Sequence, residues 1–331
     1  MNADNFRRRF RKEIDYLKPI INLVKYITQP GMHEKREHYG SENPDKTIYV
    51  IRLSNPKAGL FSILNTVLEK IMYAVDKGYY PVVDMMNYQS SYLADGDLGR
   101  ENAWDYYFEP FGDGTVSLES AYKSKNVILS SLYATEKNYH FDAYLSLQSE
   151  SDEYKKIKKY FANYIKIREE LTSKYDKICS ELIGDKKVVG VLCRGTDYIS
   201  LKPYAHPIQP GISDVIKKVD EFISKHGCTH VYLSTEDENI VKIFRETYKD
   251  KLLVYPRSYF KESRPGELVT DIINKSCSPK DAGIDYLGQI YVLSKCRYGI
   301  LSLTSATSFV SFMSAYDDEY IWNLGKYGYD D

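Results

Sequence analysis

The sequence contains few cysteines, and their positions form no recognisable pattern. Its 331 residues include five, an odd number, and no two are arranged as C-x-x-C. Disulfide-dependent secreted domains and most zinc sites need paired or closely spaced cysteines. The cysteines therefore argue against a disulfide framework and a zinc site, and they predict a protein of the reducing cytoplasm. They are Cys179, Cys193, Cys228, Cys277 and Cys296.

Long apolar runs and an excess of charge are also missing. No apolar stretch approaches the roughly 18 residues of a membrane-spanning helix, and the sequence shows no signal-peptide pattern. The 45 basic and 46 acidic residues leave a net charge of −1, so no nucleic-acid partner is expected. With 43% hydrophobic and 27% charged residues, the composition is that of an ordinary globular protein, and the length predicts two domains.

Several common functional motifs are absent as well. No G-x-G-x-x-G follows a predicted strand and there is no G-x-x-x-x-G-K-[ST], which argues against a dehydrogenase and a P-loop nucleotidase. His33 and His38 are spaced too widely to share the helix face that an H-E-x-x-H zinc site needs. Asp95 and Asp97 lie in a glycine-rich stretch and are interpreted as part of a turn. No metal site is predicted.

Residues 5–28 predict a helix with a basic beginning and an apolar end. Residues 1–40 hold nine Lys or Arg and five Asp or Glu, a local charge of +4. Basic amphipathic helices bind anionic membrane surfaces. Two hypotheses stay open: the helix makes peripheral contact with a membrane, or it packs on its own domain.

The rest of the first half has an α/β pattern. Strands are predicted at 47–53 and 80–84, and the helix between them ends at Gly78. Residues 85–125 are rich in Gly, Asp, Asn and Tyr and are predicted to be irregular. Residues 151–182 predict one long helix that bridges two domains.

The second half alternates strands and helices more regularly. The predicted strands are 188–193, 229–234, 251–255 and 298–303. The predicted helices are one capped by Ser213 and ended by Gly227, one after a capping box at 235–238, one at 284–296, and a final one beginning in the cluster 304–308. Such alternation implies βαβ units and a parallel sheet. The predicted fold is α/β, with two Rossmann-like domains, 1–184 and 185–331, facing each other across a cleft.

The carboxyl ends of these strands bring polar loops together. The first strand leads into Arg194-Gly195-Thr196-Asp197, others into Ser234–Asp237 and Pro256–Ser258, and the last into S-L-T-S-A-T-S at 302–308. Ligands of open α/β sheets bind beyond these ends, and a helix N-terminus rich in hydroxyls attracts anions. An arginine there can hold a phosphate with two hydrogen bonds. The loops therefore predict a nucleotide diphosphate site; a surface Arg–Asp pair and ordinary helix capping are the structural alternatives.

One family resembles this pattern. Arg194-Gly195-Thr196-Asp197 followed by His206-Pro207-Ile208 resembles the H-x-R-R-T-D and H-P-I motifs of the α1,6-fucosyltransferase family, which includes the N-glycan core and rhizobial nodulation fucosyltransferases. Y-L-S-T-E-D at 232–237, residues 293–305 and residues 59–84 are similar to further segments of that family. The resemblance implies a GT-B-like fold and a metal-independent, inverting transfer of fucose from GDP-fucose, with no cofactor.

The resemblance also assigns roles to residues. It implies that Arg194 neutralises the β-phosphate, that Asp197 orients this loop and that Ser305 binds phosphate. The family's motif His is Leu192 here, its second Arg is Gly195, and Lys202 stands at the position of its acidic catalytic residue. Its guanine-reading aspartate appears as Gln289, unless Asp285, one helical turn earlier, takes that role.

An inverting transfer also needs a base near the acceptor hydroxyl. Asp197, Glu236 and His206 are the candidates, and Lys202 is interpreted as a further phosphate cation. The predicted catalytic residues are Arg194, Asp197 and Lys202. The predicted substrate-binding residues are Gly59, Thr196, His206, Thr235, Glu236, Asp285, Gln289, Ser302, Thr304, Ser305 and Thr307.

The sequence thus predicts a glycosyltransferase that joins a sugar to a glycan acceptor during synthesis of a surface polysaccharide. The first half is expected to face the acceptor and the second half to bind the nucleotide-sugar. The expected location is the cytoplasm, with peripheral contact at the inner face of the membrane. Two alternatives stay open: a non-catalytic nucleotide- or glycan-binding protein on the same scaffold, and a transferase that uses another nucleotide-sugar.

Overall fold

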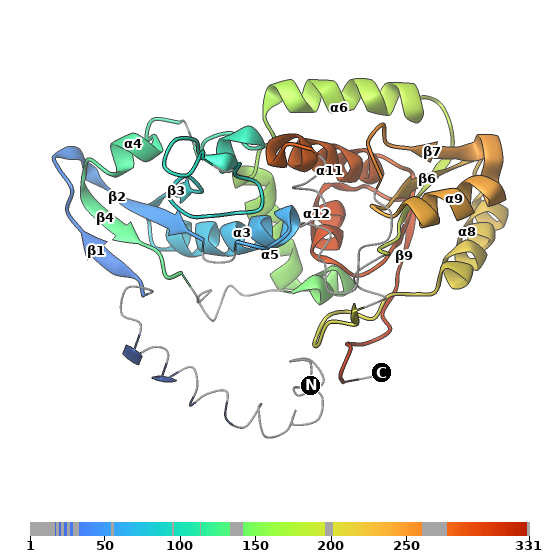
Figure 1. Ribbon diagram of the computed structural model, residues 1–331, viewed down its shortest axis with the longest axis horizontal. Helices are drawn as coiled ribbons and strands as arrows, with labels where there is room; N and C mark the ends of the chain where they lie inside the picture. The colour runs from blue at the N-terminus through green and yellow to red at the C-terminus, as the bar shows by residue number, and fades with distance from the viewer. Residues whose placement is uncertain are drawn as a thin grey trace.

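The computed structural model describes most of the chain. The described residues are 33–53, 56–94, 96–112, 114–132, 142–195, 201–259 and 277–329, with Leu17, Ile20, Leu23, Val24, Ile27 and Thr28 of a preceding helix. Two β-sheets lie side by side along the long axis of the molecule, and helices pack between and around them (Figure 1).

The first sheet is mixed, with strand order β1-β4-β2-β3. Its strands are β1 (Lys35–Glu37), β2 (Glu42–Arg52), β3 (Tyr80–Asp84) and β4 (Ser124–Leu129). β2 runs parallel to both neighbours, whereas β1 is antiparallel to β4. The strand predicted at 80–84 is confirmed, and the strand predicted at 47–53 is the second half of β2, which begins earlier, at Glu42. β1 was not predicted because its residues K-R-E carry no apolar pattern.

Helices cover both faces of this sheet. α3 (Leu60–Asp76) buries its apolar stripe, and Gly78, at φ 71°, follows its end in the left-handed conformation that glycine adopts without strain. The short helix α4 (Leu118–Ala121) packs on the opposite face with Val116 and Val127. The residues described between β3 and β4 are otherwise irregular, as predicted, apart from the 3-10 helix η2 (Ala103–Tyr106).

The long bridging helix predicted at 151–182 is two helices. α5 (Asp152–Tyr164) and α6 (Glu169–Leu182) are separated by an extended turn. In that turn Ile167 forms a β-bridge with Phe108, and the Lys166 carbonyl accepts a hydrogen bond from the Glu109 N–H. These bonds to a distant segment replace helical ones, which the periodicity of the local sequence could not indicate.

The second sheet is entirely parallel, with strand order β7-β6-β5-β8-β9. Its strands are β5 (Val188–Leu192), β6 (His230–Ser234), β7 (Leu252–Val254), β8 (Tyr298–Leu301) and β9 (Asp318–Ile321). The parallel sheet predicted for the second half is confirmed. β9 was missed, because its D-E-Y-I sequence lies at the sheet edge and has no fully buried side chain.

The helices of the second half are α8 (Ile212–His226), α9 (Glu238–Tyr248), α11 (Pro279–Ser294) and α12 (Ser305–Met313), with 3-10 helices η3 (Ala143–Gln148) and η4 (Lys249–Lys251) elsewhere. Three predicted helix starts were wrong. α8 is preceded by Gly211 rather than Ser213, the side chain of Asp237 rather than Thr235 caps α9, and α11 begins after Ser278. The predicted start of α12 is confirmed, with Thr304 as its cap.

The two sheets share one hydrophobic core. It joins buried residues of α3 and α5 to those of α11 and α12, including a ring contact between Phe61 and Phe309 at 4.9 Å between centroids. α6 lies over α11, as Figure 1 shows. The halves thus pack directly on each other through helices. The boundary at residues 184/185 and the cleft stay predictions.

The N-terminal helix exposes its apolar residues where it is described. Leu17, Ile20, Leu23, Val24 and Ile27 are 44–68% exposed. For these side chains, the structure does not support the hypothesis that the helix packs on its own domain. Within the described part of the chain, no helix combines the length and apolar character needed to cross a membrane.

Candidate functional site

A topological switch point lies at the carboxyl edge of the parallel sheet. From β5 the chain continues to β6 and β7 on one side, and β8 and β9 lie on the other. Helices therefore leave β5 and β8 towards opposite faces, and this opens a crevice in which α/β proteins bind ligands. Arg194 follows β5, and the turn into α12 follows β8.

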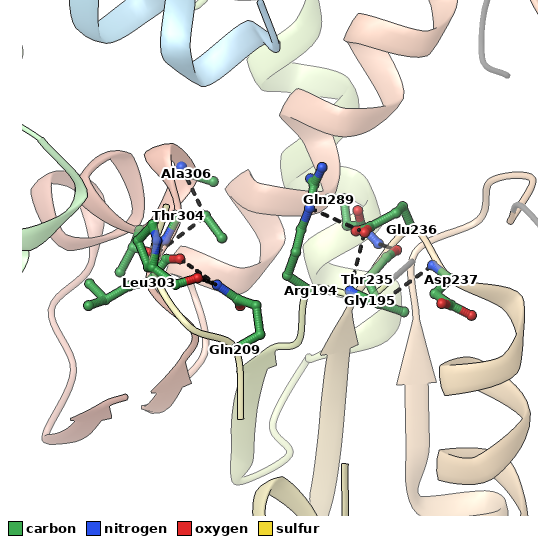
Figure 2. Close-up of polar contacts among 12 residues, drawn as sticks. Arg194, Gly195, Gln209, Thr235, Glu236, Asp237, Gln289, Leu303, Thr304 and Ala306 are labelled. Atoms are coloured by element: carbon green, nitrogen blue, oxygen red, sulfur yellow. Dashed lines mark hydrogen bonds and ion pairs between the residues drawn. The ribbon is translucent and has the colours of Figure 1, made fainter. Parts of the chain in front are cut away.

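Arg194 is held by an acid from the neighbouring strand end. Its Nε lies 3.3 Å from Oε1 of Glu236, and the Gly195 N–H donates to the same oxygen at 3.3 Å. The two side chains are only 19% and 11% exposed. Figure 2 shows the Arg194 side chain rising from the end of β5, with Glu236 and Gln289 on one side and the Thr304–Ala306 turn on the other. Glu236 therefore fixes the direction in which the guanidinium points.

Gly195 has a steric reason for its identity. A Cβ at this position would lie 2.6 Å from Oδ2 of Asp237 and 2.7 Å from Cδ1 of Ile240. Asp237 cannot move freely, since its Oδ1 accepts the N–H groups of Asn239 and Ile240 and so caps α9. The departure from the second arginine of the resembled motif thus follows from the close approach of α9.

The turn into α12 is a complete capping box. Thr304 Oγ1 accepts the Ala306 N–H at 3.2 Å, and Thr307 Oγ1 accepts the Thr304 N–H at 2.9 Å and donates to the Ser302 carbonyl at 2.6 Å. These two hydroxyls serve the helix itself. Ser302 is fully buried, whereas Ser305, the first residue of α12, remains partly exposed. Helix capping thus explains more of this cluster than the sequence indicated, and Ser305 is the hydroxyl best placed for a ligand.

A second helix N-terminus meets this turn. α3 begins after Gly59, which has no side-chain cap and open space around its Cα. One turn into α3, the Asn65 Nδ2 donates to the Ser305 carbonyl at 3.4 Å. The N-termini of α3 and α12 therefore lie close together, and both contribute positive partial charge to this region.

Tyr92 lies at this helix start, within electrostatic range of two arginines of the site. Its OH accepts the Leu60 N–H at 2.8 Å, and the residue is buried. Burial raises the pKa of Tyr92 to about 12, although the positive charges of Arg194 and Arg257 act in the opposite direction. The irregular segment after β3 thus reaches the carboxyl edge of the second sheet.

Gln289 is bonded on both sides of its amide. Its Nε2 donates to the Thr235 carbonyl at 2.8 Å, and its Oε1 accepts from Nη1 of Arg257 at 3.2 Å, while the residue is 1% exposed. Asp285, one turn earlier in α11, is partly buried, and that burial raises the pKa of its carboxyl group. Of these two predicted base-reading residues, Asp285 is the more accessible.

Lys202 and His206 lie on a segment that pairs with the C-terminal residues. The Tyr327 N–H donates to the His206 carbonyl at 2.9 Å, and the Ile208 N–H donates to the Gly325 carbonyl at 2.9 Å. Gln209 links this segment to the α12 turn, since its Nε2 donates to the Pro207 and Leu303 carbonyls, both at 3.0 Å. Figure 2 shows Gln209 directed at Leu303.

The structure brings together most of the predicted residues. Arg194, Thr235, Glu236, Asp285, Gln289, Ser302, Thr304, Ser305, Thr307 and Gly59 line or support this edge. Thr196 and Asp197 lie outside the described residues. Sequence reasoning missed Tyr92 and Gln209 as site residues. It placed Arg257 in one of the loops of the predicted site, directly after a strand, but gave it no role.

No metal centre is visible in the parts of the chain that the structure covers. Across residues 33–53, 56–94, 96–112, 114–132, 142–195, 201–259 and 277–329, no three His, Cys, Asp or Glu side chains are grouped closely enough to hold an ion.

Comparison with solved structures identifies the architecture. A NodZ α1,6-fucosyltransferase co-crystallised with GDP matches with a TM-score of 0.51 and 16% sequence identity, over 80% of this chain and 92% of that one. The chain has the fold of NodZ. NodZ soaked with GDP-fucose matches at 0.48 and 15% identity, over 81% and 93% of the two chains, and POFUT1 without ligand at 0.46 and 8%, over 83% and 97%. No protein-family model and no curated protein sequence matches the chain. The α/β architecture of two sheets is thus the one seen in the NodZ structure.

Proposed function

We propose that the protein is an inverting glycosyltransferase that needs no metal and transfers fucose from GDP-fucose to a glycan hydroxyl during surface polysaccharide synthesis. The observation that supports it best is Arg194, fixed by Glu236 at the switch point and facing the N-terminus of α12. The NodZ-like fold adds support, because that enzyme was co-crystallised with GDP.

The geometry suits departure of a diphosphate. Negative charge develops on the leaving group in such a transfer, and pre-positioned cations and helix N–H groups stabilise it without reorganisation. Arg194 supplies the cation, and the start of α12 at the partly exposed Ser305 supplies the helix N–H. Glu236, which forms an ion pair with Arg194, acts as an orienting residue in this proposal, which leaves Asp197 and His206 as candidates for the base.

Thermal unfolding with GDP, UDP, CDP, ADP and dTDP tests the donor site. A ligand at ~100 times its dissociation constant stabilises the fold by about 2.7 kcal/mol, which raises the Tm by a few degrees. We expect GDP to raise the Tm of the wild-type protein and to leave the Tm of the Arg194→Ala variant unchanged. Arg297→Ala is the matched control, because Arg297 precedes β8 at the opposite edge and pairs with Asp317 at 2.5 Å.

Hydrolysis of GDP-fucose tests catalysis. Removal of a group that stabilises developing charge costs about 100- to 1,000-fold in rate, so Arg194→Ala should lose most of the activity and keep its fold. A variant that stays within a few fold of the wild type would rule out this role. A GDP shift without hydrolysis, or without transfer to any glycan, would favour the non-catalytic binding protein, and a shift with another nucleotide would change the donor.

We further propose a cytoplasmic location with peripheral contact at the inner membrane face. The exposed apolar residues of the N-terminal helix and the local charge of +4 in residues 1–40 support it. Co-sedimentation with anionic phosphatidylglycerol vesicles should be lost when Ile20, Leu23 and Ile27 are replaced by Asn. In the control variant Leu98 and Leu147, which are exposed outside the N-terminal helix, are replaced by Asn. Equal sedimentation of both variants would contradict membrane contact through the helix.

A further inference from the structure

The site residues extend along the carboxyl edge of the second sheet, from β8 to β7. The N-terminus of α12, where Ser305 is partly exposed, follows β8, whereas Arg257 follows β7 at the other side of the sheet. Three strand spacings of about 4.8 Å separate β8 from β7, about 14 Å in total. A diphosphate bound at α12 and Arg194 would have β6 and β7 within reach of its nucleoside.

The charged groups near the ends of β6 and β7 are the guanidinium of Arg257 and the carboxylate of Asp285. Arg257 is half-buried, and its Nη1 is fixed by Oε1 of the fully buried Gln289. Gln289 is itself fixed by the Thr235 carbonyl at the end of β6. Asp285 lies one turn earlier on the same helix and within electrostatic range of Arg257. The buried amide of Gln289 thus positions a cation, and its bonds leave it unsuited to contacting a base.

We propose that Arg257, positioned by Gln289, selects the base of the donor nucleotide and favours a 6-oxopurine. This inference deepens the proposed function and rests on it. An arginine matches the two acceptors of guanine, O6 and N7, with two hydrogen bonds. Adenine presents an amino donor in place of O6, which repels a guanidinium. The carboxylate of Asp285 then makes an accessory contact to the ring N–H.

Inosine diphosphate separates this mechanism from recognition by a carboxylate alone. It keeps O6 and N7 but lacks the 2-amino group that a carboxylate would read. Titration calorimetry of the wild-type protein should give similar dissociation constants for GDP and IDP, and weaker binding of ADP by about 10- to 100-fold. IDP as weak as ADP, or UDP tighter than GDP, would overturn the proposal without any variant being made.

Substitution of Arg257 tests the residue itself. In Arg257→Gln the preference for GDP over ADP should collapse to within a few fold, and Arg257→Lys should restore only part of it, since an ammonium cannot form the paired contact. Arg194→Lys should weaken GDP, IDP and ADP equally, because it acts on the phosphates. Arg297→Gln is the control for loss of an arginine at the opposite edge.

These outcomes distinguish two failures. If GDP binds through Arg194 and the Arg257→Gln variant still prefers GDP to ADP, the base-selecting role of Arg257 is wrong and the proposed function stands. If no nucleotide binds the wild-type protein, the proposed function fails and this inference fails with it.

Discussion

The OH of Tyr92 accepts a hydrogen bond of 2.8 Å from the backbone N–H of Leu60. Leu60 is the first residue of α3, and the preceding Gly59 offers no side chain to satisfy the free N–H groups of that helix end. A tyrosine from an irregular segment thus replaces a conventional helix cap. It also lies near both arginines of the site.

Tyr92→Phe should therefore destabilise the protein. The substitution leaves the buried Leu60 N–H without its acceptor, which costs about 1–3 kcal/mol and lowers the Tm by roughly 2–4 °C in a chain of this length. Scanning calorimetry measures the change. Tyr39→Phe is the control, because Tyr39 is 42% exposed and should give no measurable shift. Equal melting of the two variants would show that water replaces the phenol at Leu60.

Gln209→Glu should damage the α12 turn. The amide Nε2 donates to the Pro207 and Leu303 carbonyls, and a carboxylate at this buried position would face both oxygens without a donor. We expect a loss of about 1–3 kcal/mol in the free energy of unfolding and weaker GDP binding, because Leu303 precedes the capping Thr304. Gln148→Glu, on the exposed end of η3, is the matched control. Unchanged GDP binding at lower stability would limit Gln209 to a structural role.

Gly195→Ala should be more harmful than its size suggests. The new Cβ would meet the cap of α9 at 2.6 Å and Ile240 at 2.7 Å, so the loop after β5 must shift. Overpacking of this kind costs typically about 1–3 kcal/mol. Gly59→Ala is the comparison, since a Cβ there meets nothing within 4 Å and its φ of −70° suits any residue. Urea unfolding of both variants measures the difference; similar midpoints would contradict the steric explanation.

The same residues show how far sequence reasoning reaches. The strands around Arg194 and the α12 turn were predictable, because buried β-branched runs and capping hydroxyls are local signals. The contacts of Gly195 with Asp237, of Gln289 with Arg257 and of Tyr92 with Leu60 join segments 32 to 42 residues apart. Such contacts depend on the strand order and on helix packing, and no local pattern indicates them. The break between α5 and α6 was missed for the same reason, since its bonds go to Phe108 and Glu109.

Asp285 should make stability depend on pH. Burial raises the pKa of its carboxyl group, and the positive charge of Arg257 partly offsets that rise. A carboxyl whose pKa is higher in the folded chain holds its proton more tightly there. Its stabilising contribution is thus complete below the unfolded value of ~3.9 and is lost as the pH rises through the folded value.

At pH 8 the ionised carboxylate of Asp285 is disfavoured by burial in the folded state. Asp285→Asn removes this unfavourable charge and should raise the Tm at pH 8. The gain should shrink as the pH is lowered towards 4, where the wild-type carboxyl is increasingly protonated in the folded state. Melting curves across this range measure it, with the exposed Asp250→Asn as the control. A gain independent of pH, or a loss at pH 8, would mean that the Arg257 charge outweighs burial.

The thiols should differ sharply in reactivity, because the thiolate is the reactive form and burial opposes its formation. Burial raises the pKa of Cys193 to about 12 and that of Cys179 to about 11, and it also raises the pKa of Cys228 and Cys296. Cys277 is exposed. Ellman's reagent at pH 8 should therefore label one thiol quickly in the folded protein and five in guanidinium. Cys277→Ser should abolish the fast phase, whereas Cys193→Ser should leave it unchanged. A fast phase that persists in Cys277→Ser would show that a segment carrying one of the other thiols opens readily, and peptide mapping of the labelled protein would identify which one.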